Sequence, residues 1–307
     1  MQEATTTEGR RSERPALGDD LDLRKAIWIA SYPKSGNTWV RVFIHNLLRQ
    51  LRGELDPQDI NALGVSTPWE VQARHFAERL GRPAAEASLL EVAAARPLVQ
   101  ADILRSCARP VLLKTHNAVA NVGGHPTINF EATLAAVYVL RNPLDVAVSY
   151  AHHAGLLSCE IVEMMQNPEA GHGTDAGNAF EFMGSWSFHV ASWMSVAHRP
   201  VLLLRYEDMR RAPERAFGRL ASFLRLEPGA EQLRRAIENS SFEEMTRQEA
   251  ARGFKERPAA AERFFRKGAV GQWREALTRE EIAAVVATHA PMMQRFGYLP
   301  EDCGAAL

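Results

Sequence analysis

Residues 26–38 read AIWIASYPKSGNT, and this stretch decides the fold. Its first five residues are apolar and prone to form a β-strand, and a loop of small and polar residues follows directly. After the loop, apolar residues recur at helical spacing: Trp39, Val40, Phe43, Ile44, Leu47 and Leu48. The pattern therefore predicts a strand, a phosphate-type loop and a helix, in that order.

The loop suits an anion because a helix N-terminus offers unpaired backbone N–H groups and the positive end of a dipole. Gly36 lets a ligand approach the backbone closely, and Lys34 adds a full charge. Further hydrogen-bond donors are supplied by Ser35, Asn37 and Thr38. In P-loop NTPases two glycines bracket four residues before Lys-Ser/Thr, so a magnesium-coordinating hydroxyl is not laid out here in the same way.

Further apolar runs predict buried strands at residues 110–114, 134–140 and 200–204. Helical stretches are predicted near residues 69–80, 86–96, 143–156 and 179–197, and the chain is mainly helical after residue 207. Because short apolar strands alternate with helices, we expect an α/β fold with a central, mostly parallel sheet flanked by helices.

Composition indicates one domain. The 307 residues are 46% hydrophobic; residues 1–22 lack periodicity and are predicted to be a disordered tail, and residues 23–307 a single domain. Lys and Arg total 36 against 37 Asp and Glu, which gives no sign of a nucleic-acid or anionic-membrane partner. No segment has the roughly 18 apolar residues of a membrane span. Three unpaired cysteines favour a reducing cytoplasm over a disulfide framework.

Three motifs carry a resemblance to the cytosolic sulfotransferases, which use 3′-phosphoadenosine 5′-phosphosulfate (PAPS) as sulfonate donor. Residues 32–39, YPKSGNTW, closely resemble the family's 5′-phosphosulfate-binding loop. Residues 141–150, RNPLDVAVSY, resemble the motif that holds the 3′-phosphate, which implies that role for Arg141 and Ser149. Residues 266–273, RKGAVGQW, resemble the element that closes over the same phosphate.

The resemblance covers residues 25–298 and implies the P-loop-containing sulfotransferase fold. It assigns 3′-phosphate binding to Arg266, Lys267 and the Gly268 N–H. Gln272 stands where the family usually has aspartate, which predicts the loss of a structural ion pair.

Weaker matches imply the residues that contact adenine. Trp39 and Phe242 are candidate stacking surfaces, Ser240 is a candidate polar contact, and Tyr206 resembles a tyrosine that reaches the adenine edge. A role in core packing is an equal alternative for Phe242 and Tyr206.

Residues 114–117, KTHN, end a predicted strand, where ligand crevices open in α/β sheets. His116 matches the family's catalytic base, so the resemblance implies that it removes the proton of the acceptor hydroxyl. Lys34 is expected to stabilise the bridging oxygen of the donor and Lys114 to hold the sulfonate. No metal is expected. The pair His152-His153 lacks the residues that would complete a metal site, which favours solvated helix positions.

The motifs do not specify the acceptor beyond a hydroxyl of a small or medium-sized molecule. The loop sequence is similar to bacterial sulfotransferases that modify antibiotics, which favours a natural-product acceptor in bacterial secondary metabolism. Residues 172–178 look flexible and are expected to gate the acceptor pocket. The sequence is compatible with a monomer or a homodimer.

Two other functions fit parts of the sequence. A P-loop kinase-like phosphotransferase shares the strand, loop and helix, but it requires a magnesium-binding aspartate after an apolar strand, where this chain has Arg141. A non-enzymatic nucleotide-binding module would make Lys34, Lys114 and His116 dispensable.

Overall fold

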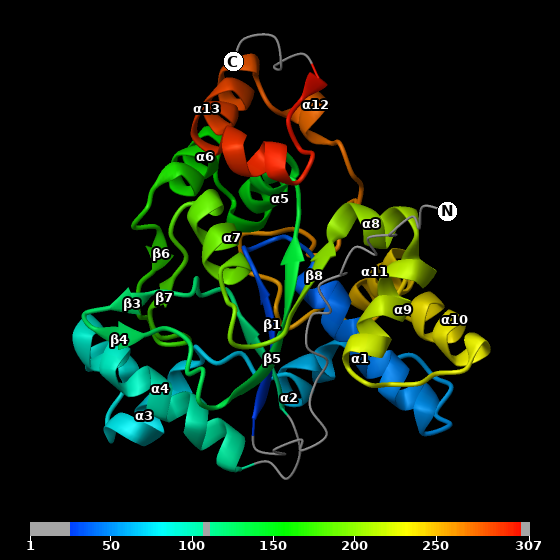
Figure 1. The fold of residues 1–307 in the computed structure, drawn as a ribbon, viewed down its shortest axis with the longest axis horizontal. Helices are drawn as coiled ribbons and strands as arrows, with labels where there is room; N and C mark the ends of the chain where they lie inside the picture. Colours follow the sequence, from blue (N-terminus) through cyan, green and yellow to red (C-terminus); the bar gives the residue numbers. More distant parts are fainter. Residues whose placement is uncertain (1–24, 107–110, 302–307) are drawn as a thin grey trace, which may run out of the picture.

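The computed structural model describes residues 25–106 and 111–301 (Figure 1). A sheet with the strand order β2-β1-β5-β8 stands at its centre, and all neighbouring strands in it are parallel. Its strands are β1 (Ala26–Ser31), β2 (Val111–Thr115), β5 (Thr133–Leu140) and β8 (Val201–Arg205). The predicted α/β fold and its four strands are confirmed to within one residue. The predicted tail at residues 1–22 lies outside the described residues.

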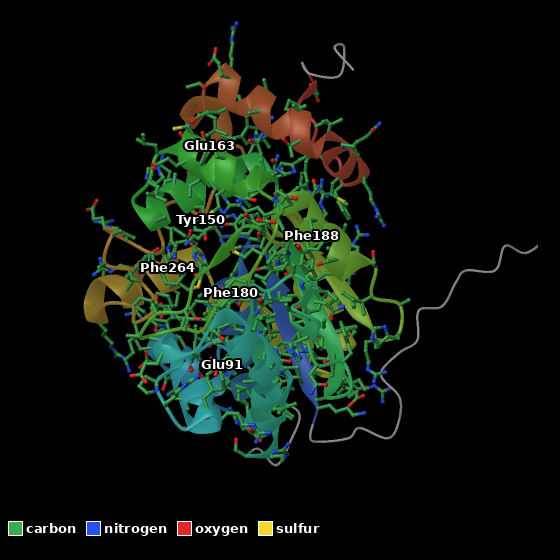
Figure 2. The ribbon with its side chains drawn as sticks, turned by 90° about the vertical axis from the view of Figure 1, so that its left-hand side faces the viewer. Glu91, Tyr150, Glu163, Phe180, Phe188 and Phe264 are labelled. Atoms are coloured by element: carbon green, nitrogen blue, oxygen red, sulfur yellow. The ribbon has the colours of Figure 1, made fainter. Side chains whose placement is uncertain are left out.

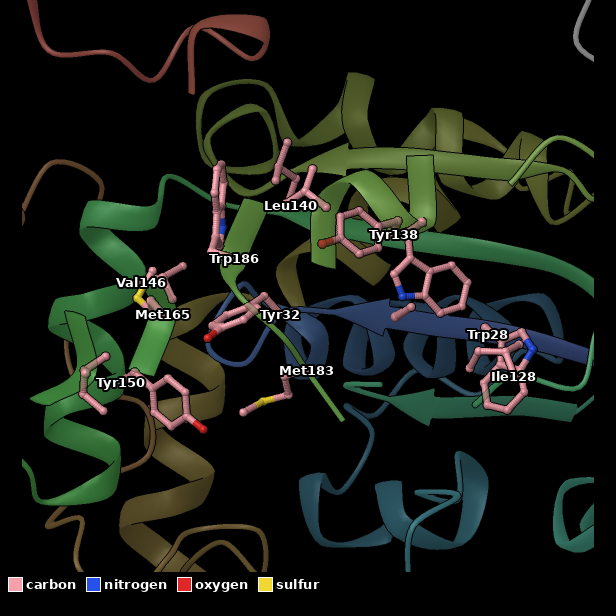
Figure 3. Packing of buried hydrophobic residues seen from close by; sticks show 14 of the residues in the cluster. Trp28, Tyr32, Ile128, Tyr138, Leu140, Val146, Tyr150, Met165, Met183 and Trp186 are labelled. Carbon is pink, nitrogen blue, oxygen red and sulfur yellow. The ribbon is translucent and has the colours of Figure 1, made fainter. Parts of the chain in front are cut away.

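Alternate side chains of the central strands pack on opposite faces of the sheet. On one face Trp28 and Tyr138 belong to a buried cluster that also includes Trp186 (Figure 3). On the other face Ile29 and Val137 pack with residues of the first helix. A parallel sheet covered on both faces is apolar along its whole length, which explains the uninterrupted apolar runs in the sequence.

Helices surround the sheet (Figure 1). The longer ones are α1 (Asn37–Leu51), α3 (Ala73–Leu80), α4 (Leu89–Arg105), α5 (Pro143–Ala154), α6 (Ser158–Gln166), α7 (Trp186–Met194), α9 (Pro213–Phe223), α10 (Ala230–Glu238), α11 (Phe242–Arg252) and α13 (Arg279–Arg295). The short ones are α2 (Leu63–Ser66), α8 (Tyr206–Arg211) and α12 (Trp273–Ala276). Within the described ranges, no helix has the length and apolar character needed to cross a bilayer.

The predicted boundaries of three helices were wrong. The first, expected near 69–80, begins only at Ala73, because Trp69 pairs with Lys114 alongside the sheet. The second, expected near 86–96, begins after the Ser88 cap and continues to Arg105. The third, expected near 179–197, is shorter because its first residues form β7.

Strand β7 (Glu181–Phe182) pairs antiparallel with β6 (Gly171–His172). A second antiparallel pair is formed by β3 (Asn121–Val122) and β4 (His125–Pro126). The Ser185 hydroxyl then accepts a hydrogen bond from the Phe188 N–H and so caps α7. The β6–β7 hairpin places the segment after α6 beside the end of β2, where the candidate site lies.

A buried ion pair ties α4 to the end of β2. Arg96 donates to Glu70 over 2.9 Å, and both side chains are at most 2% exposed. The same carboxylate accepts hydrogen bonds from the Thr115 hydroxyl at 3.2 Å and from Asn117 Nδ2 at 2.6 Å. The residue between these two is His116, so the ion pair fixes the backbone on both sides of that histidine.

We predict that Arg96→Met destabilises the protein by about 3–5 kcal/mol, because it leaves the Glu70 carboxylate buried without its cation. The control is Arg82→Met, which breaks a pair with Glu91 whose side chains are 43% and 49% exposed. Exposed pairs contribute at most about 1 kcal/mol. Urea unfolding measures both, and equal losses in the two variants would contradict the prediction.

Candidate active site

A cavity of about 660 Å³ opens at the carboxyl ends of β1, β2 and β5. Two residues of its wall, Tyr150 and Phe264, lie between Glu163 on α6 and Glu91 on α4 in Figure 2. Most of the predicted site residues line it: Lys34, Gly36, Asn37, Thr38, Trp39, Lys114, His116, Arg141, Ser149, Tyr206, Phe242, Arg266, Lys267 and Gly268. Motifs that are far apart in the sequence therefore meet in one place.

The loop after β1 is held in an unusual conformation. Gly36 has a φ of 109°, and a Cβ there would lie 2.8 Å from Tyr206 Cδ2, so only glycine fits. Asn37 Nδ2 donates to the Ile29 carbonyl at 2.8 Å, so this side chain closes the loop onto β1. Ser35 is buried, does not line the cavity, and its hydroxyl has no partner among the described residues.

The Lys34 ammonium group lies against a histidine and an aromatic ring. Its Nζ lies 3.1 Å from His153 Nδ1 and 4.1 Å from the centre of the Phe264 ring. Burial and, after it, the positive charges of Arg141 and Lys114 lower the pKa of Lys34 to about 7. An anion bound here would offset that repulsion.

The geometry of His116 fixes which ring nitrogen carries the proton. Its Nδ1 lies 2.8 Å from the Ser31 carbonyl oxygen, which can only accept, so Nδ1–H donates. Burial and the charge of Lys114 hold the pKa of His116 well below its ordinary value. The ring is therefore neutral near pH 7, and Nε2 keeps its lone pair. This is the state that a general base requires.

A second histidine, His189, forms a hydrogen bond with the backbone of His116. His189 Nε2 lies 3.0 Å from the His116 carbonyl oxygen, and its Nδ1 lies 2.8 Å from the Tyr138 hydroxyl. Burial lowers the pKa of His189 to about 4, so it is neutral and donates to the carbonyl from Nε2. His116 is thus held through both its ring and its backbone.

Lys114 is held by two groups that the sequence did not indicate. Its Nζ lies 3.4 Å from Glu256 Oε2 and 3.7 Å from the centre of the Trp69 ring. Glu256 is also bound by Arg41 through two hydrogen bonds, at 2.9 and 2.5 Å. Burial raises the pKa of Glu256, but the charges of Lys114 and Arg41 outweigh it and leave that pKa below its ordinary value.

Arg141 joins the loop after β1 to the loop near the C-terminus. Its guanidinium donates to the Lys34 carbonyl at 3.0 Å and to the Ala269 carbonyl at 3.1 Å, and it lies over the Tyr206 ring. Ser149 follows on the next helix, α5, and lines the same wall. The predicted proximity of Arg141 and Ser149 in one cavity is confirmed.

Residues 266–273 are anchored by Asp145. Its carboxylate accepts from the Gly271 N–H at 2.7 Å and from the Trp273 N–H at 3.2 Å. Gln272, which replaces the usual aspartate, accepts a hydrogen bond of 2.7 Å from Arg266. A hydrogen bond from the Arg266 cation to a neutral amide oxygen is therefore present at the position where the loss of an ion pair was expected.

The structure places two side chains differently from what the sequence suggested. Ser240 is fully buried outside the cavity, where its hydroxyl donates to the Ala236 carbonyl and accepts from Asn46. His153, expected to be solvated, lines the cavity, whereas its neighbour His152 is exposed. Tyr206 lines the cavity with its ring, and its hydroxyl donates to the Gly268 carbonyl at 2.9 Å.

The Sulfotransferase domain family matches residues 24–297. The chain belongs to the family of PAPS-dependent sulfotransferases. It is 30% identical to Sulfotransferase 1B1 of Canis lupus familiaris over 82% of this chain and 78% of the relative. It is 26% identical to Sulfotransferase 1A1 of Bos taurus over 86% of this chain and 82% of that protein.

Solved sulfotransferase structures share the fold. The mouse sulfotransferase SULT7A1 complexed with PAP (adenosine 3′,5′-bisphosphate) superposes with a TM-score of 0.59 at 19% identity. The superposition covers 93% of this chain and 87% of the other. Retinol dehydratase in complex with androsterone and PAP gives a TM-score of 0.58 at 20% identity, covering 89% and 81%. The predicted sulfotransferase fold is thereby confirmed.

We predict that Lys34 takes up roughly one proton when adenosine 3′,5′-bisphosphate binds at pH 8, and that Lys34 takes up almost none at pH 6. Lys34, with a pKa of about 7, is mostly neutral at pH 8 in the empty site, and bound phosphate would restore its charge. Calorimetry in buffers of different ionisation enthalpy measures the uptake. In Lys34→Met the uptake at pH 8 should fall sharply; an unchanged value would assign the proton elsewhere.

Proposed function

We propose that this enzyme transfers the sulfonate group of PAPS to a hydroxyl of a small or medium-sized acceptor, with His116 as general base. The observation that carries the proposal is the hydrogen bond from His116 Nδ1 to the Ser31 carbonyl at 2.8 Å. It leaves the Nε2 lone pair to the cavity that Lys34 and Lys114 also line.

The proposed reaction is an in-line displacement at sulfur. His116 Nε2 takes the proton of the acceptor hydroxyl, the acceptor oxygen bonds to sulfur, and the bond from sulfur to the bridging phosphate oxygen breaks. Adenosine 3′,5′-bisphosphate leaves with the electrons of that bond. A loose transition state places most of the catalytic demand on alignment and on charge stabilisation.

The two lysines divide the developing charge. Lys34 lies on the phosphate loop, so we assign it to the bridging oxygen, on which negative charge grows as the bond to sulfur breaks. Lys114 lies at the end of β2 beside His116 and is assigned to the sulfonate oxygens. Because a sulfonate carries less charge than a terminal phosphate, these cations suffice in the proposed mechanism and no metal takes part.

The donor assignment rests on three elements that converge on one cavity. The loop at 34–39 would hold the 5′-phosphosulfate, and Arg141 and Ser149 would hold the 3′-phosphate together with residues 266–268. Trp39 and Phe242 offer apolar ring surface for the base. Both similar solved structures were obtained with PAP bound, which supports the same donor here.

We propose a natural product as the acceptor and the cytoplasm as the place of the reaction. The loop sequence supports the first, through its similarity to bacterial sulfotransferases that modify antibiotics. Retinol dehydratase, one of the similar structures, was solved with androsterone, a small hydroxylated molecule. The segment at 172–178, proposed as a gate, contributes His172 and Asn178 to the cavity wall.

We predict that His116→Ala lowers kcat by about 10²–10⁴-fold, since that is the usual contribution of a general base. Its affinity for adenosine 3′,5′-bisphosphate should stay within about threefold of wild type, because the base does not hold the nucleotide. Transfer of ³⁵S-sulfonate from PAPS and calorimetry measure the two quantities. His125→Ala, which lies outside the cavity wall, is the control. Near-normal turnover of His116→Ala would remove it from the mechanism, and binding of ATP with magnesium alone would favour a kinase.

We predict that Arg141→Met weakens PAPS binding by at least about tenfold more than it weakens binding of adenosine 5′-phosphosulfate, which lacks the 3′-phosphate. The control is Arg199→Met, because among the described residues Arg199 also donates only to backbone carbonyls, those of Thr133, His198 and Phe130. Competition of the two donors with adenosine 3′,5′-bisphosphate measures the affinities. Equal losses on both donors would contradict the 3′-phosphate assignment.

A further inference from the structure

Glu181 uses only one of its two carboxylate oxygens inside the protein. Its Oε1 accepts from the His116 backbone N–H at 2.9 Å and from Trp69 Nε1 at 3.2 Å. Oε2 has no hydrogen bond to any of the described residues, yet it is not fully closed off from solvent. Because Glu181 is one of the residues that line the cavity, Oε2 is the oxygen available to a ligand there.

The surroundings of Glu181 form a polar wall. His172 stands directly opposite it in the β6–β7 pair, so both side chains project from one face of the hairpin. A second backbone pairing joins Gln72 to Asn178. All four side chains line the cavity on the His116 side, and the Tyr150 hydroxyl lies 2.8 Å from His172 Nε2. An acceptor beside His116 therefore meets hydrogen-bonding groups rather than a wholly apolar wall.

The Glu181 carboxylate is poorly solvated in the empty protein, since the residue is 2% exposed. Burial and, after it, the neighbouring carboxylate of Glu70 raise the pKa of Glu181 to about 7. A ligand donor that reaches Oε2 would restore part of the solvation that this carboxylate loses on burial. The donor nucleotide is itself anionic and would be repelled by this carboxylate. The complementary group therefore belongs to the other substrate.

We propose that Glu181 Oε2 accepts a hydrogen bond from a second hydroxyl of the acceptor, next to the hydroxyl that His116 deprotonates, and so selects vicinal diols and catechols. The inference rests on the proposed function, because it takes the reacting hydroxyl to lie at His116. The other oxygen of the same carboxylate accepts from the His116 backbone N–H, so the carboxylate lies next to the proposed base, and the inference takes the two hydroxyls to be on neighbouring carbons. A ligand ammonium would meet the positive charges of Lys34 and Lys114 in the same cavity.

The test is the affinity of matched naphthalenes for the full-length protein, with and without saturating adenosine 3′,5′-bisphosphate, measured by calorimetry. The probes are 2,3-dihydroxynaphthalene and its monomethyl ether 3-methoxy-2-naphthol. At pH 8, above the pKa of Glu181 of about 7, wild type should bind the diol at least about tenfold more tightly, as expected for a hydrogen bond to a charged group. Binding alone is measured, so the comparison does not depend on turnover.

Glu181→Gln sharpens the comparison, because its amide oxygen can keep both internal hydrogen bonds while its NH₂ group replaces the accepting oxygen. The preference for the diol should then fall below about threefold. Glu163→Gln, an exposed position on α6 (Figure 2), should leave the preference unchanged. The inference is overturned if wild type binds the diol and the ether equally, a comparison that needs no variant. It is also overturned if Glu181→Gln weakens both probes alike, since Glu181 would then act only through His116.

Failure of the proposed function gives a different result. Sulfonate transfer from PAPS to both 2-naphthol and the diol, without any preference in binding, would refute the diol assignment and keep the enzyme. Failure to bind adenosine 3′,5′-bisphosphate would refute the proposed function, while a diol preference that Glu181→Gln abolishes would still assign the subsite.

Discussion

Three cations, Lys34, Lys114 and Arg141, lie in the wall of one cavity, and the arrangement of the surrounding residues depends on how their charge is carried. The Arg141 guanidinium donates hydrogen bonds to two backbone carbonyls. Lys114 is paired with Glu256, which Arg41 binds in turn. Lys34 has no carboxylate partner among the described residues; its Nζ contacts a neutral histidine and an aromatic ring. Because no carboxylate among the described residues is paired with Lys34, a bound anion would favour its charged form, and this makes the site receptive to a polyanionic donor.

The same charges explain why His116 can serve as a base. Positive charge nearby and burial both disfavour the imidazolium, so the ring stays neutral at a pH where an exposed histidine would be partly protonated. A low pKa also makes a weaker base, and the protein offsets this by fixing the ring at Nδ1. Once an anionic donor is bound, the local potential falls, and proton transfer to Nε2 becomes more favourable. In the proposed mechanism, donor binding would therefore strengthen the base through electrostatics.

How far the sequence predicted the structure depended on the range of the interactions. The four strands and the loop at 34–39 were predictable because their signals are local: apolar runs, a glycine and a helix start. The start of α7 was misplaced because residues 179–182 pair with partners elsewhere in the chain, and that pairing is not written in local periodicity. The motif matches placed Arg141, Ser149 and His116 correctly around one cavity. Ser240 lies outside the cavity wall, and its hydroxyl bonds the Ala236 carbonyl in the preceding helix α10, which a motif match does not reveal.

The residues that the sequence missed act through long-range contacts. Glu256, Arg41, Glu181 and Trp69 carry no motif, and each gains its role only from a partner distant along the chain. Close packing at two glycines, Gly36 and Gly268, joins the loops at 34–39 and 266–273 through the same kind of long-range contact. The absence of a side chain at Gly36 admits the Tyr206 ring, and the Tyr206 hydroxyl then bonds the Gly268 carbonyl. At Gly268 a Cβ would lie 2.5 Å from the Phe242 ring. A larger residue at either glycine would therefore disturb elements far from it in sequence. The loops at 34–39 and 266–273 thus pack together with the Tyr206 and Phe242 rings as one unit.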